Sequence, residues 1–277
     1  MTAIEERVAA HYTTASLLER IRQALVDMGV DPGAARPDDL KPVDEFHTAG
    51  VESTEALLDQ LDIDPDTRVL DIGSGLGGTA RMIAARYGAG VTGVDLTPNF
   101  VETATALSDM VGLGDRTRFE VGSALDLPVE DHSYDLALLL HVGMNVADKQ
   151  ALFREARRAL APRGTFAIFE VMRGPREGAL QFPYPWAEDS DFSFVEPPDV
   201  YRGAADAVGF MPVAERDRSS FAIDYFTGVF AALAENGPPA LGIHLLMRDT
   251  APVKLQNYVA GVKAGLIAPV EMIFRAA

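Results

Sequence analysis

An aspartate two residues ahead of a run of glycines is the feature of this sequence best suited to binding a ligand. The stretch VLDIGSGLGG, residues 69–78, holds Asp71 and four glycines. Glycines at a strand end let backbone N–H groups approach a polar or anionic ligand at the start of the next helix. A carboxylate at that strand end suits a ligand that brings a cation, such as the ammonium group of an amino acid. We therefore predict a cofactor-binding loop at 69–78.

The same glycines fit two cofactor fingerprints. Gly73, Gly75 and Gly78 match the G-x-G-x-x-G pattern of nicotinamide dinucleotide sites, and Asp95 lies about twenty residues further on, where an acid would hold a ribose. Asp71 favours a different ligand, because a dinucleotide-binding strand normally stays apolar at that position. Gly77 extends the pattern to D-x-G-x-G-x-G-G.

Alternating short strands and helices would position these residues. The predicted strands are TRVLDI, GVTGVD, RFEVG, YDLALLL and TFAIFEVM, and helices are predicted at 77–87, 97–110 and 148–160. This alternation is typical of βαβ units, so we predict an α/β fold with a doubly wound, mostly parallel sheet. Strands near 213–219 and 270–276 would complete a seven-stranded sheet.

The chain divides into three predicted segments. Residues 1–62 form a helical N-terminal segment, in which helical spacing runs over 4–28 and ends at Gly29, a loop covers 31–42, and a helix over 53–61 is capped by Ser53. Residues 63–173 form the cofactor-binding core. Residues 174–277 contain the rest of the sheet and two insertions, 174–199 and 226–264, that act as a lid or cap over the substrate.

Composition excludes several partners. The formal net charge of −17 disfavours nucleic acid and anionic membrane surfaces. No apolar run approaches the ~20 residues that cross a bilayer. The absence of cysteine removes disulfides and thiolate nucleophiles. We therefore expect a cytoplasmic protein whose partner is a small molecule.

Residues 45–173 resemble the class I S-adenosylmethionine-dependent methyltransferases, which have a Rossmann-like fold. In that family the glycine turn wraps the methionine part of the cofactor, and the acid that ends the second strand binds both ribose hydroxyls. The resemblance implies S-adenosyl-L-methionine as the cofactor. The implied binding residues are His47, Gly50, Asp71, Gly73, Ser74, Gly75, Gly77, Asp95, Leu96, Ser123, Ala124, Leu125 and His141.

Two segments refine this resemblance. DEFHTAGVESTEALLDQL is similar to the entry segment of the small-molecule branch that includes sarcosine/dimethylglycine and ubiquinone/menaquinone-type enzymes, where an H-x-x-G segment, here His47 and Gly50, lies beside the methionine end. In VGSALDLP, Ser123 stands where many members carry an acid for the adenine amino group. Its hydroxyl and the backbone of Ala124 and Leu125 can still bond a base edge.

His141 and Glu170 end the fourth and fifth predicted strands and are the candidate catalytic pair. A histidine titrates near neutrality and can take the proton of an oxygen nucleophile. The alternative for His141 is a shelf that contacts the cofactor without moving protons, and the alternative for Glu170 is to satisfy local backbone. The motif set implies no metal.

The substrate is left open by the sequence. Aromatic residues of the first insertion either wall a cavity or form a local core; they are Phe182, Tyr184, Trp186, Phe192 and Phe194. The second insertion is either another wall or a homodimer surface. We predict methyl transfer to nitrogen or oxygen of a small molecule, with an NAD-type oxidoreductase and a catalytically inactive, methyltransferase-like binding protein as alternatives.

Overall fold

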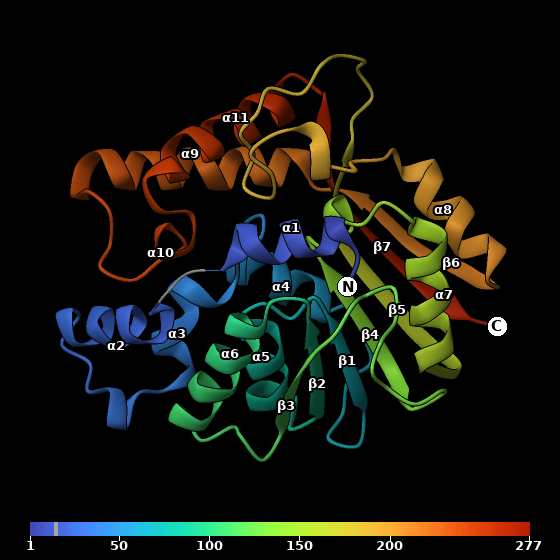
Figure 1. The fold of residues 1–277 in the computed structure, drawn as a ribbon, viewed down its shortest axis with the longest axis horizontal. Helices are drawn as coiled ribbons and strands as arrows, with labels where there is room; N and C mark the ends of the chain where they lie inside the picture. Colours follow the sequence, from blue (N-terminus) through green and yellow to red (C-terminus); the bar gives the residue numbers. More distant parts are fainter. Residues whose placement is uncertain (14–15) are drawn as a thin grey trace. The chain divides into compact units, whose positions relative to one another are not determined.

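Seven strands form one sheet in the order β3-β2-β1-β4-β5-β7-β6, in a computed structural model that describes residues 1–13 and 16–277 (Figure 1). The strands are β1 (Arg68–Ile72), β2 (Gly90–Asp95), β3 (Thr117–Val121), β4 (Tyr134–Leu140), β5 (Leu160–Arg173), β6 (Phe210–Asp217) and β7 (Ile267–Ala276). Strand β2 pairs in parallel with β1 and β3, and β4 pairs in parallel with β5. Strand β7 is antiparallel to both β5 and β6. The predicted doubly wound, mostly parallel α/β sheet is confirmed.

The chain folds as two units. The first contains residues 1–128 and 238–248, and the second contains 129–237 and 249–277. The helices of the first unit are α1 (Ala3–Tyr12), α2 (Leu17–Asp27), η1 (Pro32–Ala34), α3 (Pro37–Asp44), α4 (Gly50–Leu58), α5 (Gly78–Tyr87), α6 (Pro98–Met110) and α10 (His244–Met247). Those of the second are η2 (Gly143–Asn145), α7 (Lys149–Ala159), η3 (Ser190–Phe192), α8 (Pro198–Ala207), α9 (Ser219–Asn236) and α11 (Ala251–Lys263), while η4 (Arg248–Thr250) joins the two.

The prediction of a loop over 31–42 was wrong. Helix α3 occupies the second half of that stretch and begins at Pro37, whose fixed φ suits the first turn of a helix. Asp39 stabilises this start, since its Oδ2 accepts the Arg36 N–H at 2.8 Å. Proline and aspartate interrupt helices, but both are also favoured at a helix N-terminus, which is why the prediction failed here.

Two predictions about the N-terminal helices also need correction. The helical spacing over 4–28 corresponds to two helices, α1 and α2, and residues 14–15 between them lie outside the described chain. Ser53 does not cap α4, which starts at Gly50 with Ala49 as its N-cap. Instead the buried Ser53 hydroxyl donates to the backbone carbonyls of Thr48, at 2.6 Å, and Gly50, at 2.8 Å.

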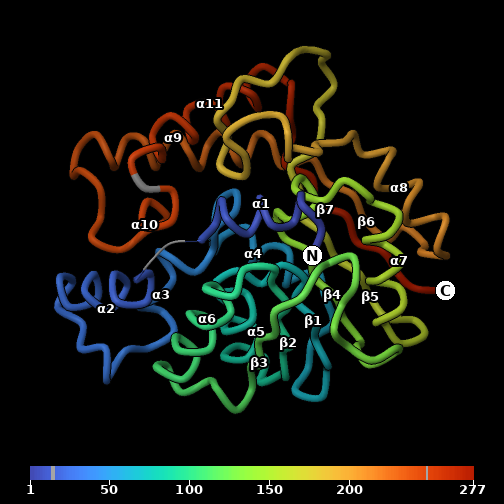
Figure 2. Tube along the Cα trace, viewed as in Figure 1, coloured from blue at the N-terminus to red at the C-terminus, as the bar shows by residue number. Residues whose placement is uncertain are grey.

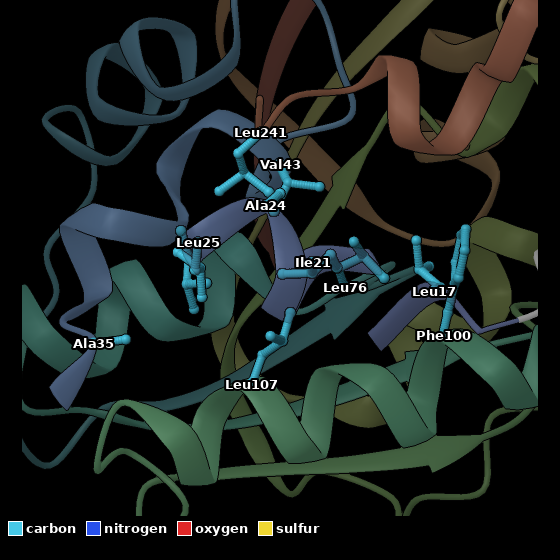
Figure 3. Packing of buried hydrophobic residues seen from close by; sticks show 11 residues of the cluster. Leu17, Ile21, Ala24, Leu25, Ala35, Val43, Leu76, Phe100, Leu107 and Leu241 are labelled. Atoms are coloured by element: carbon cyan, nitrogen blue, oxygen red, sulfur yellow. The ribbon is translucent and has the colours of Figure 1, made fainter. Parts of the chain in front are cut away.

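Helix α2 supplies the apolar face that covers α6 in the first unit (Figure 3). Leu17, Ile21 and Leu25 lie in one core cluster with Phe100 and Leu107 of α6. Leu76 of the glycine loop and Leu241 beside α10 join the same cluster. Each fully buried leucine or isoleucine contributes about 1.5–3 kcal/mol relative to exposure. The glycine loop is therefore anchored by packing at Leu76.

In the second unit, α9 and α11 run beside each other and both contact β7 (Figure 2). Tyr258 of α11 packs on Phe226 of α9, with ring centroids 5.5 Å apart. These helices and the segment 174–199 occupy the two predicted insertions.

Candidate functional site

The glycine loop between β1 and α5 has the open backbone that a ligand site requires. Gly73, Gly75 and Gly77 have φ of 77°, 52° and 77°, which L side chains rarely adopt. The N–H groups of Gly73 and Ser74 donate to the Val94 carbonyl at 2.7 and 3.1 Å, which ties the loop to the end of β2. A Cβ added at Gly75 would meet no heavy atom within 4 Å in the described part of the chain. A ligand can therefore approach the loop closely at Gly75.

Gly78 has a different reason to be glycine. A Cβ there would lie 2.4 Å from the carbonyl oxygen of Asp44, at the end of α3. The Asp44 carboxylate also forms a buried ion pair with Arg81 of α5. Gly78 thus serves close helix packing, and the G-x-G-x-x-G match that includes it carries less information about a dinucleotide.

Asp71, the last but one residue of β1, carries a buried carboxyl group. It is 2% exposed, and its Oδ2 has no hydrogen-bond partner among residues 1–13 and 16–277. Burial, followed by the charges of Glu45 and Asp95, raises its pKa to about 8. Buried polar groups are normally satisfied, and a buried charge needs an opposite charge. The site is thus arranged to receive a cation.

Glu45 forms a polar cluster that sequence reasoning missed. Its Oε2 accepts bonds from Thr54 and Thr79 hydroxyls, each at 3.1 Å, and lies 2.7 Å from Nε2 of His47. Burial raises the pKa of Glu45. These hydrogen bonds and His47 lower it by a larger amount, so the net pKa is below its usual value. An ionised Glu45 near Asp71 adds negative charge to the pocket. Its position two residues before His47 gave no periodic signal that would have identified it.

His47 and Gly50 form a tight turn in front of α4. The Gly50 N–H donates to the His47 carbonyl at 3.2 Å, and the His47 side chain is 5% exposed. The imidazole therefore contacts Glu45 and Thr54 inside the first unit, and the Thr54 hydroxyl oxygen lies 2.9 Å from Nε2.

Asp95, at the end of β2, binds two neighbouring backbone segments. Its Oδ2 accepts the Gly75 N–H at 2.9 Å and its Oδ1 accepts the Thr97 N–H at 2.8 Å. Burial raises its pKa although both bonds lower it. The Thr97 side chain donates a further hydrogen bond to this carboxylate. Leu96 follows directly and is half-buried.

The loop after β3 completes the strand ends of the first unit. The Gly122 N–H donates to the Asp95 carbonyl at 3.0 Å, so this loop lies beside the end of β2. The Ser123 hydroxyl accepts the Leu125 N–H at 3.0 Å and donates to Oε1 of Glu5 on α1. Ala124 and Leu125 are half-buried. The structure therefore brings Asp71, Asp95 and Ser123 to adjoining ends of β1, β2 and β3.

His141 follows β4 in the second unit and has a strained backbone, with φ of 55°. Its Nδ1 lies 2.9 Å from the Phe169 carbonyl, and its N–H donates to the same oxygen at 2.7 Å. A carbonyl only accepts, so Nδ1 carries a hydrogen and Nε2 holds the lone pair of the neutral ring. Strain of this kind concentrates at functional sites. The geometry fits a base that acts through Nε2.

Glu170 is wholly buried, and its bonds go to local backbone. Its Oε1 accepts the Val142 N–H at 2.9 Å, while Oε2 is buried and finds no partner in the described residues. Burial raises its pKa to about 7, opposed by the N–H groups of residues 142–144 and by the charge of Lys149. The carboxylate therefore braces the turn that follows His141.

Tyr201 and Lys149 lie close to this carboxylate. A Cβ placed on Gly143 would lie 2.9 Å from the Tyr201 hydroxyl and 3.0 Å from Oε2 of Glu170. Burial lowers the pKa of Lys149 to about 8, and its Nζ donates to the Phe194 carbonyl at 2.8 Å. Sequence reasoning missed both residues, because their distance from Glu170 along the chain has no regular spacing.

The first insertion, 174–199, contains a small aromatic core. Tyr184 and Trp186 are buried and stacked, with ring centroids 4.6 Å apart, and Phe192 is also buried. Asn145 of η2 donates to the carbonyls of Trp186, at 3.0 Å, and Phe192, at 3.2 Å. Trp186 also packs on Tyr258 of α11, with ring centroids 6.4 Å apart, so this aromatic core joins the insertion to α11. Phe182 and Phe194 are half-buried.

The described residues contain no group of three histidine or acidic side chains placed to hold a metal ion. Over the same residues, no helix has both the length and the apolarity needed to cross a bilayer.

Comparison with known proteins agrees with this geometry. Residues 70–168 match the family described as "Methyltransferase domain". A methyltransferase of Streptomyces halstedii, GfsG, is 33% identical over 134 residues, which cover 48% of this chain and 48% of that protein. The chain thus spans about half the length of this curated relative. The resemblance to class I methyltransferases is confirmed.

Two solved structures show the same fold over most of the chain. A candidate sarcosine dimethylglycine methyltransferase from Galdieria sulphuraria superposes with a TM-score of 0.69 and 24% identity, covering 82% of this chain and 85% of that one. Geranyl diphosphate C-methyltransferase from Streptomyces coelicolor superposes with a TM-score of 0.72 and 18% identity, covering 100% and 99%.

Proposed function

Because residues 70–168 match the family described as "Methyltransferase domain", we propose that this chain is an S-adenosylmethionine-dependent enzyme. In this proposal it transfers a methyl group to nitrogen or oxygen of a small-molecule acceptor by in-line displacement. The observation that carries it is the buried, unneutralised carboxylate of Asp71 beside the open backbone at Gly75.

The strand ends of the first unit fit the parts of this cofactor. Adjacent strands lie about 5 Å apart, so the ends of β1, β2 and β3 can hold three polar parts of one extended ligand. Asp71 would bind the ammonium, Asp95 the ribose hydroxyls, and the loop from Ser123 to Leu125 the base. Gly73, Ser74, Gly75, Gly77, Leu96, His47 and Gly50 would shape the surrounding wall.

A dinucleotide fits this pocket less well. A pyrophosphate at the glycine loop would face the ionised carboxylate of Glu45 and the buried acid Asp71, and the like charge of Glu45 disfavours it. The methionine end of adenosylmethionine instead brings an ammonium that neutralises one of them. The electrostatics therefore support the methyltransferase over the NAD-type oxidoreductase.

The bound sulfonium supplies an already activated methyl group, so the protein's task is alignment, exclusion of water and removal of a proton. His141 would act through Nε2 and take the proton of a hydroxyl acceptor. Glu170 would hold the turn at Val142 that fixes the position of His141. An amine acceptor that arrives neutral needs less help from a base.

The proposal of a small-molecule methyl acceptor rests on the net charge of the chain and on the two predicted insertions. The net charge of −17 supports a small-molecule partner rather than nucleic acid. Segments 174–199 and 226–264 would enclose the acceptor, and the cytoplasm would be the place of action.

Calorimetry with S-adenosylhomocysteine and, separately, NADH tests the proposal. We expect binding of S-adenosylhomocysteine and no measurable binding of NADH. Tight NADH binding without S-adenosylhomocysteine binding would overturn it. Incubation with labelled adenosylmethionine and a metabolite extract, followed by mass identification of the labelled product, would then separate an active enzyme from an inactive binding protein.

A further inference from the structure

The loop after β3 lacks an obvious group for the base. If the amino acid lies at Asp71 and the ribose at Asp95, the base reaches the next strand end, where Ser123 stands. The Ser123 hydroxyl hydrogen is directed to Oε1 of Glu5, and its oxygen already accepts the Leu125 N–H. Ser123 is thus largely engaged, whereas a purine amino group needs an acceptor.

Glu5 brings a carboxylate to this loop from a distant part of the chain. It occupies the third position of α1, where its Oε2 accepts the Thr2 N–H at 2.5 Å in a capping box. The capping box uses only that oxygen. The contact between Oε1 and Ser123 spans 118 residues of sequence, so it fixes α1 on the loop after β3 rather than serving the helix itself.

The other end of α1 is also anchored near the pocket. The Tyr12 ring lies 5.9 Å from Phe100 of α6 and 6.2 Å from Phe46, centroid to centroid, and Phe46 follows Glu45 directly. A ten-residue helix is about 15 Å long, and α1 contacts Ser123 near its first turn and Phe46 at its last residue. Figures 1 and 2 show the course of this helix. Burial raises the pKa of Glu5, but bonds from Ser123 and Thr2 outweigh it, so the pKa is lowered and the side chain is ionised at neutral pH.

We propose that Glu5 supplies the carboxylate that accepts a hydrogen bond from the exocyclic amino group of the cofactor's purine, so that the site selects a 6-amino over a 6-oxo purine. This inference rests on the proposed function, because it assumes an adenosine-bearing ligand at the first unit. It assigns the base-recognition acid to the N-terminal helix instead of the loop after β3.

Calorimetry on the full chain with S-adenosylhomocysteine and S-inosylhomocysteine tests this assignment. The wild type should bind the adenosyl compound at least about tenfold more tightly, since a carboxylate facing a 6-oxo group is repelled and unpaired. Glu5→Gln should reduce this preference by about fivefold or more, because a carboxamide can donate to the 6-oxo group. Glutamine is also accepted at this position of a capping box, so α1 is retained.

Glu6→Gln is the matched control, as it removes the same charge from an exposed neighbouring residue, and it should leave the preference unchanged. Adding Ser123→Asp to Glu5→Gln should restore the preference by placing an acid on the loop itself. An unchanged preference in Glu5→Gln, or one that stays low in the double variant, would overturn the inference. Failure of the wild type to bind S-adenosylhomocysteine would instead overturn the proposed function.

Discussion

Asp71 in the first unit and Glu170 in the second are both buried carboxyls with raised pKa values, about 8 and about 7, but their surroundings differ. Next to Asp71 stand two further acids, Glu45 and Asp95, which add to the effect of burial. Around Glu170 stand backbone N–H donors and Lys149, which oppose burial. The charges that act on Asp71 add to the effect of burial, whereas the groups around Glu170 compensate part of it.

This difference assigns different roles to the two acids. A group that the protein leaves uncompensated gains most from a ligand, so Asp71 should control binding. A group that the protein compensates internally gains little, so Glu170 should act by holding the turn after His141.

His141→Ala should have the largest effect on turnover. Loss of a general base lowers the rate by about 10²–10⁴-fold, and we expect this for a hydroxyl acceptor with little change in S-adenosylhomocysteine affinity. Single-turnover rates and calorimetry measure the two quantities, with exposed His132→Ala as the control. If turnover and affinity fall together, the ring is a cofactor shelf rather than a base.

Asp71→Asn should lower S-adenosylhomocysteine affinity by roughly 10–150-fold, because a hydrogen bond to a charged group contributes about 1.5–3 kcal/mol. Isothermal titration at pH 8.5, where the wild-type carboxyl is mostly ionised, gives the cleanest comparison. Asp66→Asn, on an exposed turn of the same unit, should change nothing. Equal affinities for wild type and Asp71→Asn would contradict the role of Asp71 in ligand binding.

The strand-end residues could be predicted because their signal is local. Asp71, the glycines and Asp95 lie within two consecutive strand–turn–helix units, so hydrophobic periodicity and spacing place them without tertiary information. The same holds for α5, α6 and α7, whose predicted ranges agree closely with the structure.

The partners of those residues could not be predicted in the same way. Glu45 reaches Thr79 across 34 residues, and Glu5 reaches Ser123 across 118, and neither distance has a periodic signature. The helix α3 was missed for a local reason, because Pro37 and Asp39 serve turns and helix starts equally well. The sheet thus follows from pattern, whereas the electrostatics of the site depend on long-range contacts.

The pH dependence of binding probes Asp71 without mutation. Below pH 8 the free carboxyl is mostly protonated, and an incoming ammonium favours the ionised form, so binding releases a proton. The affinity for S-adenosylhomocysteine should therefore rise about tenfold from pH 6 to pH 7 and level off above pH 8. Titration calorimetry in buffers of different ionisation enthalpy measures both affinity and proton release. Asp71→Asn should show a flat profile, and a flat profile in the wild type would contradict the pKa assignment.

Glu170→Gln should produce the smallest effect, and one on stability rather than binding. The pKa of Glu170 is about 7 in the folded chain and near its ordinary value of 4.5 when unfolded. Between these values the folded state binds more protons, so the carboxyl's contribution to stability falls as pH rises and stops falling above pH 7. From pH 6 to pH 8 the wild type should lose about 1.4 kcal/mol relative to Glu170→Gln, as measured by urea unfolding. Exposed Glu177→Gln should track the wild type. If the difference in unfolding free energy between wild type and Glu170→Gln is the same at all pH values, Glu170 is fully neutralised by Lys149 and the backbone. If Glu170→Gln instead causes a large loss of S-adenosylhomocysteine affinity, Asp71 and Glu170 share one role.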